Sequence, residues 1–562
     1  MCYQSAERGE RKSQLKRSSV LKKTPKSVVT AILVLLFLSS VTFLGETISF
    51  PRRPKLVLIL VIDQFRYDYL VRFQKQFVQG GFNLLLNGGA NFVDCRYDYA
   101  TTFTGPGHAT LLTGAYPNAH GIISNNWYDP STRRSVYCVE DPSTRLVAGA
   151  GGASGTPGYS PHYMFGSTLG DELRAATDFH SKVLSVSLKD RAAVLMGGHS
   201  PSAAYWYEPG MGRFVSSTYY MADLPSWVAQ FNEKSPAKAY CGRKWTALVE
   251  TPGAGGHVLS EYREAPGEPC PDPKFLGWLD TTPFMTEMEM SFAEEAIRNE
   301  HLGQGSDTDL LAVSLSVNDY IGHAFGPYSP EIADNVLRTD RDLAAFLGDL
   351  DKLVGLDNVW IALTADHGVA PNPEFIQNHK LGLGYAHKAS IRTAVDKALA
   401  SAFGPGSWVE GSDDFYVYLN HEALERHGLQ LAQAEEVAAE AAASVPGVWE
   451  AFTRTQLLTG KLPKTSVARA VSNSFNAKRG GDIFIVLEPY AVPVSGSREA
   501  DHSTPWNYDS QVPLLLWGKA FIPGVYFTPC QPIDLAATLA AALGLSQPSG
   551  AQGRPLVPAI RP

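Results

Sequence analysis

The sequence predicts an α/β fold in which a mostly parallel central sheet is sandwiched by helices and carries inserted cap regions. Continuous apolar runs recur along the chain, and such runs are typical of strands buried on both faces. Segments with helical periodicity separate these runs. Carboxylate, ammonium or imidazole side chains follow several of the runs, at the sheet edge where such folds place their functional residues.

The predicted strands are short and uncharged, and they cover residues 55–62, 183–188, 310–317, 359–364 and 512–517. The clearest predicted helix runs from Pro330 to Val354, with Ser329 as its cap and apolar residues on one face. Further helices are expected at Leu431–Ala443 and Ile533–Leu543. Residues 51–562 are therefore expected to form one large domain.

Two regions interrupt the alternation of strands and helices. Residues of about 200–285 are rich in aromatic side chains, and residues of about 371–480 carry the alanine-rich helix. We interpret both as insertions that form a cap over the functional edge of the sheet. The Gly/Ala-rich stretch Ala148–Gly158 predicts a mobile loop. A phosphate-binding role is not favoured there, because the stretch has neither the Walker nor the dinucleotide-binding spacing.

Residues 1–50 are expected to be a targeting segment. Eight basic residues lie between Arg8 and Lys26, and a charge-free apolar run follows from Ser27 to about Gly45. This order predicts export to the periplasm or another extracytoplasmic space. Two alternatives stay open, a cleaved signal peptide and an uncleaved segment that attaches the protein to the membrane.

The net charge and the cysteine content disfavour certain partners and metal sites. The net charge of -8 and a pI near 6.0 argue against nucleic acid as a binding partner. Cys95 with Cys138, and Cys241 with Cys270, are plausible disulfides for an oxidising compartment, although the sequence does not fix the connectivity. Because no Cys-x-x-Cys pair is present, a thiolate zinc site is not favoured.

The stretch Thr104–Gly107 predicts the beginning of a helix, with Thr104 at the cap and Pro106 in the first turn. Unpaired N–H groups and the positive end of a helix dipole make such a place favourable for a phosphoryl group. The alternative is an ordinary capping threonine.

Carboxylates and imidazoles at the strand ends predict a metal site. Asp319 and His323 are four residues apart, so on a helix they share a face. Asp366 and His367 follow another strand, and Asp63 and His502 complete a thiolate-free set suited to zinc in an open catalytic site. The remaining candidates are interpreted as loop or helix histidines without a paired carboxylate: His108, His120, His162, His257, His379 and His387.

In these motifs the chain resembles the alkaline phosphatase superfamily, and within it the phosphate-irrepressible alkaline phosphatases, which are similar to the nucleotide pyrophosphatase/phosphodiesterases. The motifs that carry the resemblance follow the order of that family over the whole body: Val61–Asp63, Thr104–His108, Gly121–Asp129, Ser187–Arg191, Asp319–His323, Thr364–Gly368 and the segment around His502. The resemblance implies an alkaline phosphatase-like catalytic domain at 51–562. It also implies hydrolysis of phosphate monoesters through a phosphothreonine intermediate, with release of inorganic phosphate.

The resemblance also assigns roles to single residues. One zinc ion would be held by Asp63, Asp366 and His367, with Thr104 as its fourth ligand and as the nucleophile. A second zinc ion would be held by Asp319, His323 and His502. Asn125, Lys189 and Arg191 would contact the phosphoryl oxygens.

Lys189 and Arg191 separate the close alternatives. They are two residues apart, so on an extended segment they point the same way. A monoester has one more charged oxygen than a diester, so the two cations favour a monoesterase over a phosphodiesterase on the same fold. A sulfatase is disfavoured because the segment after Cys530 lacks the required arginine. An inactive metal-binding surface module is the remaining alternative.

Overall fold

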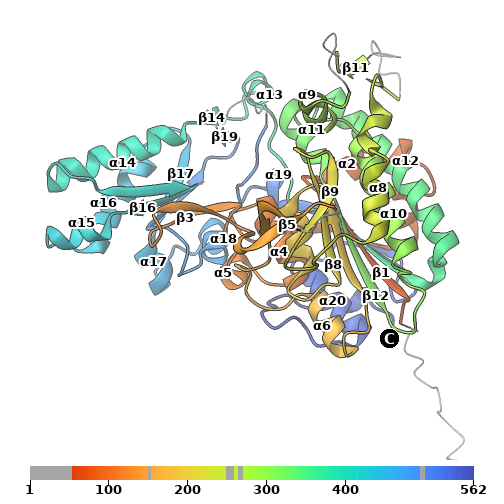
Figure 1. Cartoon of the computed structure of the whole chain (residues 1–562). Helices are drawn as coiled ribbons and strands as arrows, with labels where there is room; N and C mark the ends of the chain where they lie inside the picture. The colour runs from red at the N-terminus through yellow and green to blue at the C-terminus, as the bar shows by residue number, and fades with distance from the viewer. Residues whose placement is uncertain (1–52, 150–152, 249–257, 264–269, 414, 494–499) are drawn as a thin grey trace, which may run out of the picture. The chain divides into compact units, whose positions relative to one another are not determined.

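The computed structural model describes residues 53–149, 153–248, 258–263, 270–413, 415–493 and 500–562. Its largest element is an eleven-stranded sheet in the order β21-β2-β20-β13-β1-β12-β7-β8-β9-β5-β6 (Figure 1). In that order the strands span Gly524–Tyr526, Ala90–Arg96, Gln511–Trp517, Val359–Thr364, Leu56–Ile62, Asp309–Leu315, Val183–Ser187, Ala203–Glu208, Arg213–Ser217, Glu140–Val147 and Ala153–Tyr159. The predicted α/β class is confirmed.

The centre of the sheet is parallel, and four of its strands are those predicted from apolar runs. β1 lies between β12 and β13, with Leu56 opposite Asp309 on one side and Val359 on the other. β7 and β8 continue the parallel pairing beyond β12. The carboxyl ends of these strands therefore meet at one edge of the sheet, where the polar residues that follow them gather.

Antiparallel strands complete the sheet on both flanks. β20 is antiparallel to β13 and to β2, and β8, β9, β5 and β6 pair successively in the antiparallel sense. The mobile loop predicted at Ala148–Gly158 is wrong for residues 153–158, which belong to β6. Glycine and alanine have low strand propensity, but pairing with β5 supplies the hydrogen bonds of this segment.

Helices cover both faces of the sheet (Figure 1). One group packs around α12, which begins at Pro330, ends at Leu353 and is capped by the Ser329 hydroxyl, as predicted. The other group packs around α4 at the carboxyl edge. The first group comprises α12, α2 (Tyr67–Phe73), α3 (Phe82–Gly88) and α10 (Phe284–Asn299); the second comprises α4 (Thr104–Thr113), α7 (Asp190–Gly197) and α20 (Asp534–Leu543).

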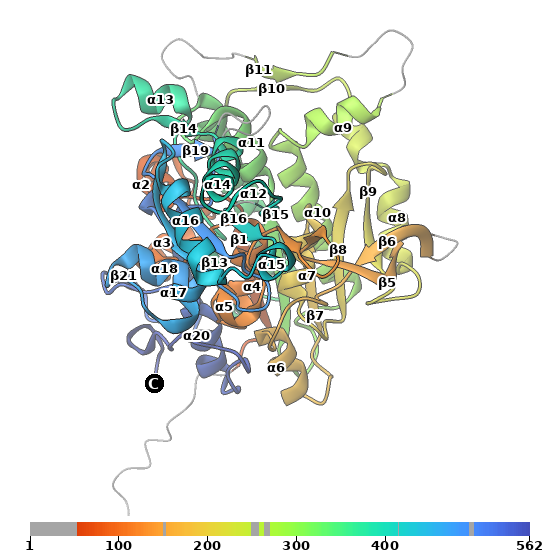
Figure 2. The same ribbon diagram turned by 90° about the vertical axis from the view of Figure 1, so that its left-hand side faces the viewer.

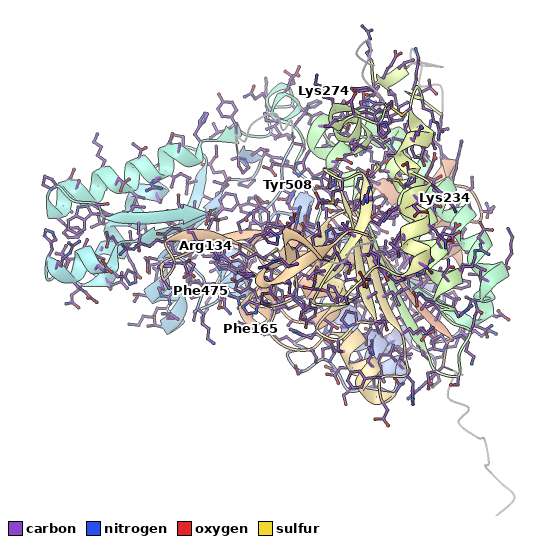
Figure 3. All side chains as sticks on the ribbon, viewed as in Figure 1. Arg134, Phe165, Lys234, Lys274, Phe475 and Tyr508 are labelled. Carbon is purple, nitrogen blue, oxygen red and sulfur yellow. A yellow bond between two sulfur atoms is a disulfide. The ribbon has the colours of Figure 1, made fainter. Side chains whose placement is uncertain are left out.

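A smaller four-stranded sheet occupies most of the second predicted insertion (Figures 1 and 2). Its order is β15-β16-β18-β17, and α14 (Lys388–Phe403) and α16 (Leu431–Ala443) pack together beside it. Its strands span Val409–Asp413, Tyr416–Leu419, Ile483–Leu487 and Val448–Thr453. Phe475, labelled in Figure 3, packs in a hydrophobic cluster that joins this sheet to the large one. In the first predicted insertion, β8 and β9 are strands of the large sheet.

One of the two predicted disulfides is present and the other is not. Cys241 and Cys270 form the predicted disulfide. The pairing of Cys95 with Cys138 is wrong, because both are free, buried thiols. Cys95 lies on β2, where its backbone pairs with Cys530 instead. The predicted targeting segment lies outside the described residues, and no helix among the residues that the structure describes is long and apolar enough to cross a membrane.

Candidate active site

Thr104 is the first residue of α4 and lies at the carboxyl edge of the sheet. The predicted cap position is one residue off, because Phe103 takes the extended cap conformation and the Thr104 hydroxyl does not cap the helix. This hydroxyl is buried and accepts a long hydrogen bond of 3.5 Å from Arg191 Nη2. Gly107 lets α4 approach the end of β13, since a Cβ there would lie 2.5 Å from the Asp366 carbonyl oxygen.

The first metal-capable group consists of Asp63, Asp366 and His367. Asp63 follows β1 directly, and Asp366 and His367 follow the neighbouring strand β13, so parallel pairing brings them together. His367 Nε2 lies 3.5 Å from Asp63 Oδ1 and 3.3 Å from Asp366 Oδ2. All three atoms are buried and have no hydrogen-bond partner among the described residues. Such orphaned oxygen and nitrogen atoms converging on one point fit a metal cation.

The second group contains Asp319, His323 and His502. Asp319 and His323 lie one turn apart on α11 (Val317–Phe325), as predicted, and His323 Nε2 is 3.2 Å from Asp319 Oδ1. His502 Nε2 lies 3.7 Å from the same oxygen. The rings of His367 and His502 stack with centroids 3.7 Å apart, which places the two groups side by side.

The histidine tautomers fit metal binding. The Nδ1 atoms of His323, His367 and His502 lie 2.7–2.9 Å from the backbone carbonyls of Ala500, Gly368 and Thr102. Since a carbonyl oxygen only accepts, each Nδ1 carries a proton, and the neutral form of each ring has its acceptor nitrogen at Nε2. Backbone carbonyls thus orient all three imidazoles, as they do in metalloproteins.

The two groups carry an excess of buried negative charge. Burial, and then the charge of Asp63, raises the pKa of Asp366 well above its usual value. Burial lowers the pKa of His367, so this imidazole is neutral. Burial would raise the pKa of Asp319, but His323 and Lys189 hold it well below the usual value. Such charge is costly without cations, and divalent ions would offset it.

Lys189 lies between the two groups. Its Nζ is 2.6 Å from Asp63 Oδ2 and 2.6 Å from Asp319 Oδ2. Burial would lower the pKa of Lys189, but these carboxylates raise it, so the side chain is an ammonium ion. The expected extended segment is wrong, because Lys189 precedes α7 and Arg191 lies in its first turn. Both cations still reach the site, and both lie close to Tyr320.

Asn125 and Arg191 contact the first turn of α4. Asn125 Oδ1 accepts the Gly105 backbone N–H at 2.8 Å, which ties its segment to the first turn of α4. Arg191 Nη1 donates to the Tyr137 hydroxyl at 3.3 Å, and this hydroxyl in turn donates to Asp190. Burial would lower the pKa of Arg191, but Tyr137 and Asp190 raise it. Every residue predicted for the site is thus brought to this edge of the sheet.

Three neighbours of the metal groups were missed from the sequence. One is Asp501, a buried carboxylate that groups with His323 and His502 as a possible cation site. His108 was interpreted as a helix residue without a carboxylate partner, but its Nδ1 lies 3.3 Å from Asp366 Oδ2. Its position four residues after Thr104, on the same helix face, could have indicated this. Gln64 bonds one carboxylate of each group, through its backbone N–H to Asp366 and its side chain to Asp319. No pattern in the sequence indicates that contact.

Comparison with known proteins gives one family and several close relatives. The profile of the type I phosphodiesterase/nucleotide pyrophosphatase family matches residues 57–510. Alkaline phosphatase PafA of Elizabethkingia meningoseptica is 34% identical over 96% of this chain and 99% of its own. Alkaline phosphatase PhoV of Synechococcus elongatus is 36% identical over 89% and 92%. A protein of Myroides odoratus named calcium-transporting ATPase is 36% identical over 90% and 95%.

Solved structures agree with the sequence relatives. The crystal structure of wild-type PafA has a TM-score of 0.82 to this chain, with 34% identity, and covers 91% of this chain and 99% of its own. A PafA variant of known structure, with a TM-score of 0.81, carries a threonine-to-serine change and alanine in place of an asparagine, a lysine and an arginine. The last two are two positions apart, like Lys189 and Arg191.

Proposed function

We propose that this chain, which belongs to the type I phosphodiesterase/nucleotide pyrophosphatase family, is an alkaline phosphatase that uses Thr104 as its nucleophile. The enzyme class rests on relatives that match almost the whole chain and on the shared fold. The role of Thr104 is supported by its place at the start of α4 and by its contact with the buried guanidinium of Arg191.

The donor set fits two zinc ions. Asp63, Asp366, His367 and Thr104 would hold one, and Asp319, His323 and His502 the other. The fit is supported by the orphaned atoms of the first group and by the Nδ1–carbonyl hydrogen bonds that orient the three imidazoles. Bound zinc would favour the alkoxide of the threonine and offset charge on the phosphoryl oxygens.

The residues of the chain then divide the work of phosphoryl transfer. Thr104 Oγ attacks phosphorus in line, the bond to the leaving oxygen breaks, and its electron pair departs with the alcohol. This gives phosphothreonine, and attack by water on the same phosphorus restores Thr104 and releases inorganic phosphate. The N-terminus of α4 points its positive dipole end toward the transferred group. Fixed charges and positioning supply most of the rate in such reactions.

One observation favours a monoesterase over a phosphodiesterase, and it is the pair of buried cations beside Thr104. Arg191 reaches Thr104 Oγ, and Lys189 lies between the two metal-capable groups. Both are placed to meet the additional charged oxygen of a monoester. We therefore infer small phosphate monoesters as substrates, with phosphodiester hydrolysis as the alternative.

We also infer that the protein acts outside the cytoplasm. The basic residues before Lys26 and the apolar run that follows are typical of an export segment. The Cys241–Cys270 disulfide is consistent with an oxidising compartment. Attachment to a membrane through the amino-terminal segment is part of this proposal, as an alternative to cleavage.

The first test compares hydrolysis of an aryl phosphate monoester with that of the matching diester by zinc-loaded protein. We expect strong preference for the monoester and loss of activity on chelation. Thr104→Ala should lose at least about 1,000-fold in kcat, since it removes the nucleophile, while its zinc content stays close to that of the wild type. Thr110→Ala, on the same helix, is the control. Diester preference, or full activity of Thr104→Ala, would contradict the proposal.

A further inference from the structure

Gln64 occupies an unusual backbone position next to the active site. It follows Asp63, at the end of β1, and is fully buried. Its φ of 62° lies in the left-handed region, which is strained for a residue other than glycine. Such a conformation persists only where the surroundings fix it, so its contacts are informative.

Those contacts reach one carboxylate of each metal-capable group. The backbone N–H of Gln64 donates to Asp366 Oδ1 at 3.0 Å, and its side-chain Nε2 donates to Asp319 Oδ1 at 2.7 Å. The left-handed turn allows one residue to direct both donors at the site. Asp319 Oδ1 is also the oxygen that lies near Nε2 of His323 and of His502, so Gln64 contacts the atom around which the second group is built.

Gly322 provides the space for the Gln64 amide. This glycine lies inside α11, between Asp319 and His323, where glycine is less favourable than alanine. A Cβ at this position would overlap Gln64 Oε1 and would lie 3.0 Å from its Cδ. The glycine is thus explained by the close approach of Gln64 to the helix that carries Asp319 and His323.

We propose that Gln64 is a positioning residue that holds the two metal-binding groups in a fixed relation to each other. It does so by orienting Asp366 through its main chain and Asp319 through its side chain. The inference rests on the proposed two-metal function. It assigns a role to a residue that contacts neither the nucleophile nor any cation-binding imidazole in the described hydrogen bonds.

The test uses Gln64→Met, which keeps the length of the side chain but removes its donor. Metal-depleted full-length protein is titrated with Co²⁺ alone, and the visible absorption of each bound ion is recorded. We expect the wild type to bind two ions, and the variant to bind one of them about 10- to 100-fold more weakly, with a changed spectrum for that ion. The control is Gln531→Met, the same chemical change at a partly buried glutamine whose described bonds are to Tyr116 and Asp534.

The outcomes separate the inference from the proposed function. A wild-type protein that binds fewer than two ions would overturn the two-metal proposal and this inference with it. Two ions in the wild type with unchanged affinities and spectra in Gln64→Met would overturn the inference alone. The melting temperature of the metal-depleted proteins identifies a variant that fails to fold. In that case Gln64→Gly, which keeps the main-chain donor and relieves the left-handed strain, gives the same readout.

A mutant cycle with Gly322 tests the same contact independently. Gly322→Ala alone should displace the Gln64 amide and weaken Co²⁺ binding about 10-fold or more. In the Gln64→Gly background the added methyl group meets no amide, so the same substitution should have little further effect. Non-additivity of this kind supports the contact, and equal losses in both backgrounds would overturn it.

Discussion

Three carboxylates are buried at the site, those of Asp63, Asp319 and Asp366. The Lys189 ammonium group contacts two of them, Asp63 and Asp319. It contacts Oδ2 of Asp63, whereas Oδ1 of the same carboxylate lies near His367 Nε2. Its position therefore suits two tasks, contact with a phosphoryl oxygen and orientation of two ligands. A single substitution of Lys189 will report on both tasks together.

At this scale we predict the effect of the double variant Lys189→Ala, Arg191→Ala. Monoester turnover should fall about 100-fold or more, and diester turnover much less, because a diester lacks the second unsubstituted charged oxygen. The measurement is kcat/KM for both substrates at equal zinc loading, beside the surface variant Lys352→Ala. Equal losses on the two substrates would refute the assigned role.

Single residues show where prediction from sequence works. Asp63, Asp319, Asp366 and His367 follow predicted strands, so parallel pairing was enough to bring them together. Gln64 and His108 were not predictable in this way. The contact of Gln64 depends on a positive φ, and that of His108 depends on how closely α4 packs against β13.

At the scale of elements, a histidine at the start of α15 (His421–Arg426) contacts the residue directly before β18. His421 Nε2 lies 2.9 Å from Asp482 Oδ1. This hydrogen bond raises the pKa of His421, against the opposing effect of burial. The folded pKa therefore exceeds the unfolded value of about 6.5, so the stabilisation is complete below that pH and is lost as pH rises through the folded pKa.

We accordingly predict that His421→Gln lowers the melting temperature more in acid than in base. The side chain is 51% exposed, so the stabilisation removed is below about 1 kcal/mol. Melting temperatures of wild type and variant are compared about two pH units below and above pH 6.5, with the exposed His387→Gln as control. A difference that grows toward high pH would contradict the sign of this linkage.

Elements were predictable where their pattern is local. α12 and α16 were found nearly to the residue, because a cap and an amphipathic repeat mark α12 and an alanine-rich composition marks α16. β6 was missed because its glycines and alanine have low strand propensity, although its partner β5 is the preceding strand. The membership of β8 and β9 in the large sheet was missed because their aromatic-rich stretch was interpreted as an insertion. The cysteines show a different limit, because Cys95 meets Cys530 only through the pairing order of the sheet.

At the scale of the whole molecule, an aromatic pair connects the small sheet to the start of α4. Phe415, which immediately precedes β16, stacks on Phe103 with ring centroids 6.5 Å apart. Phe103 precedes Thr104 and also packs edge-on against His502 at 5.6 Å. The core of the small sheet therefore includes Phe103, the residue before α4.

We predict that Phe415→Ala lowers kcat/KM for an aryl monoester about 10- to 100-fold, because small displacements of a nucleophile are costly. Zinc content should stay unchanged. Phe403→Ala is the matched control, since Phe403 packs on Trp408 in the same cluster, away from Phe103. If both variants lose the same activity, the effect comes from the stability of the small sheet and the proposed coupling is absent.

The strand order also determines when neighbouring strands can pair during synthesis of the chain. β1 is the first strand of the large sheet to be synthesised, yet both of its neighbours, β12 and β13, begin at residues 309 and 359. At ~5–20 residues per second, the uniformly apolar β1 waits roughly 13–50 s for its first neighbour. The centre of the large sheet therefore cannot form until more than half of the 562-residue chain has been made, although β5 to β9 can pair with one another earlier.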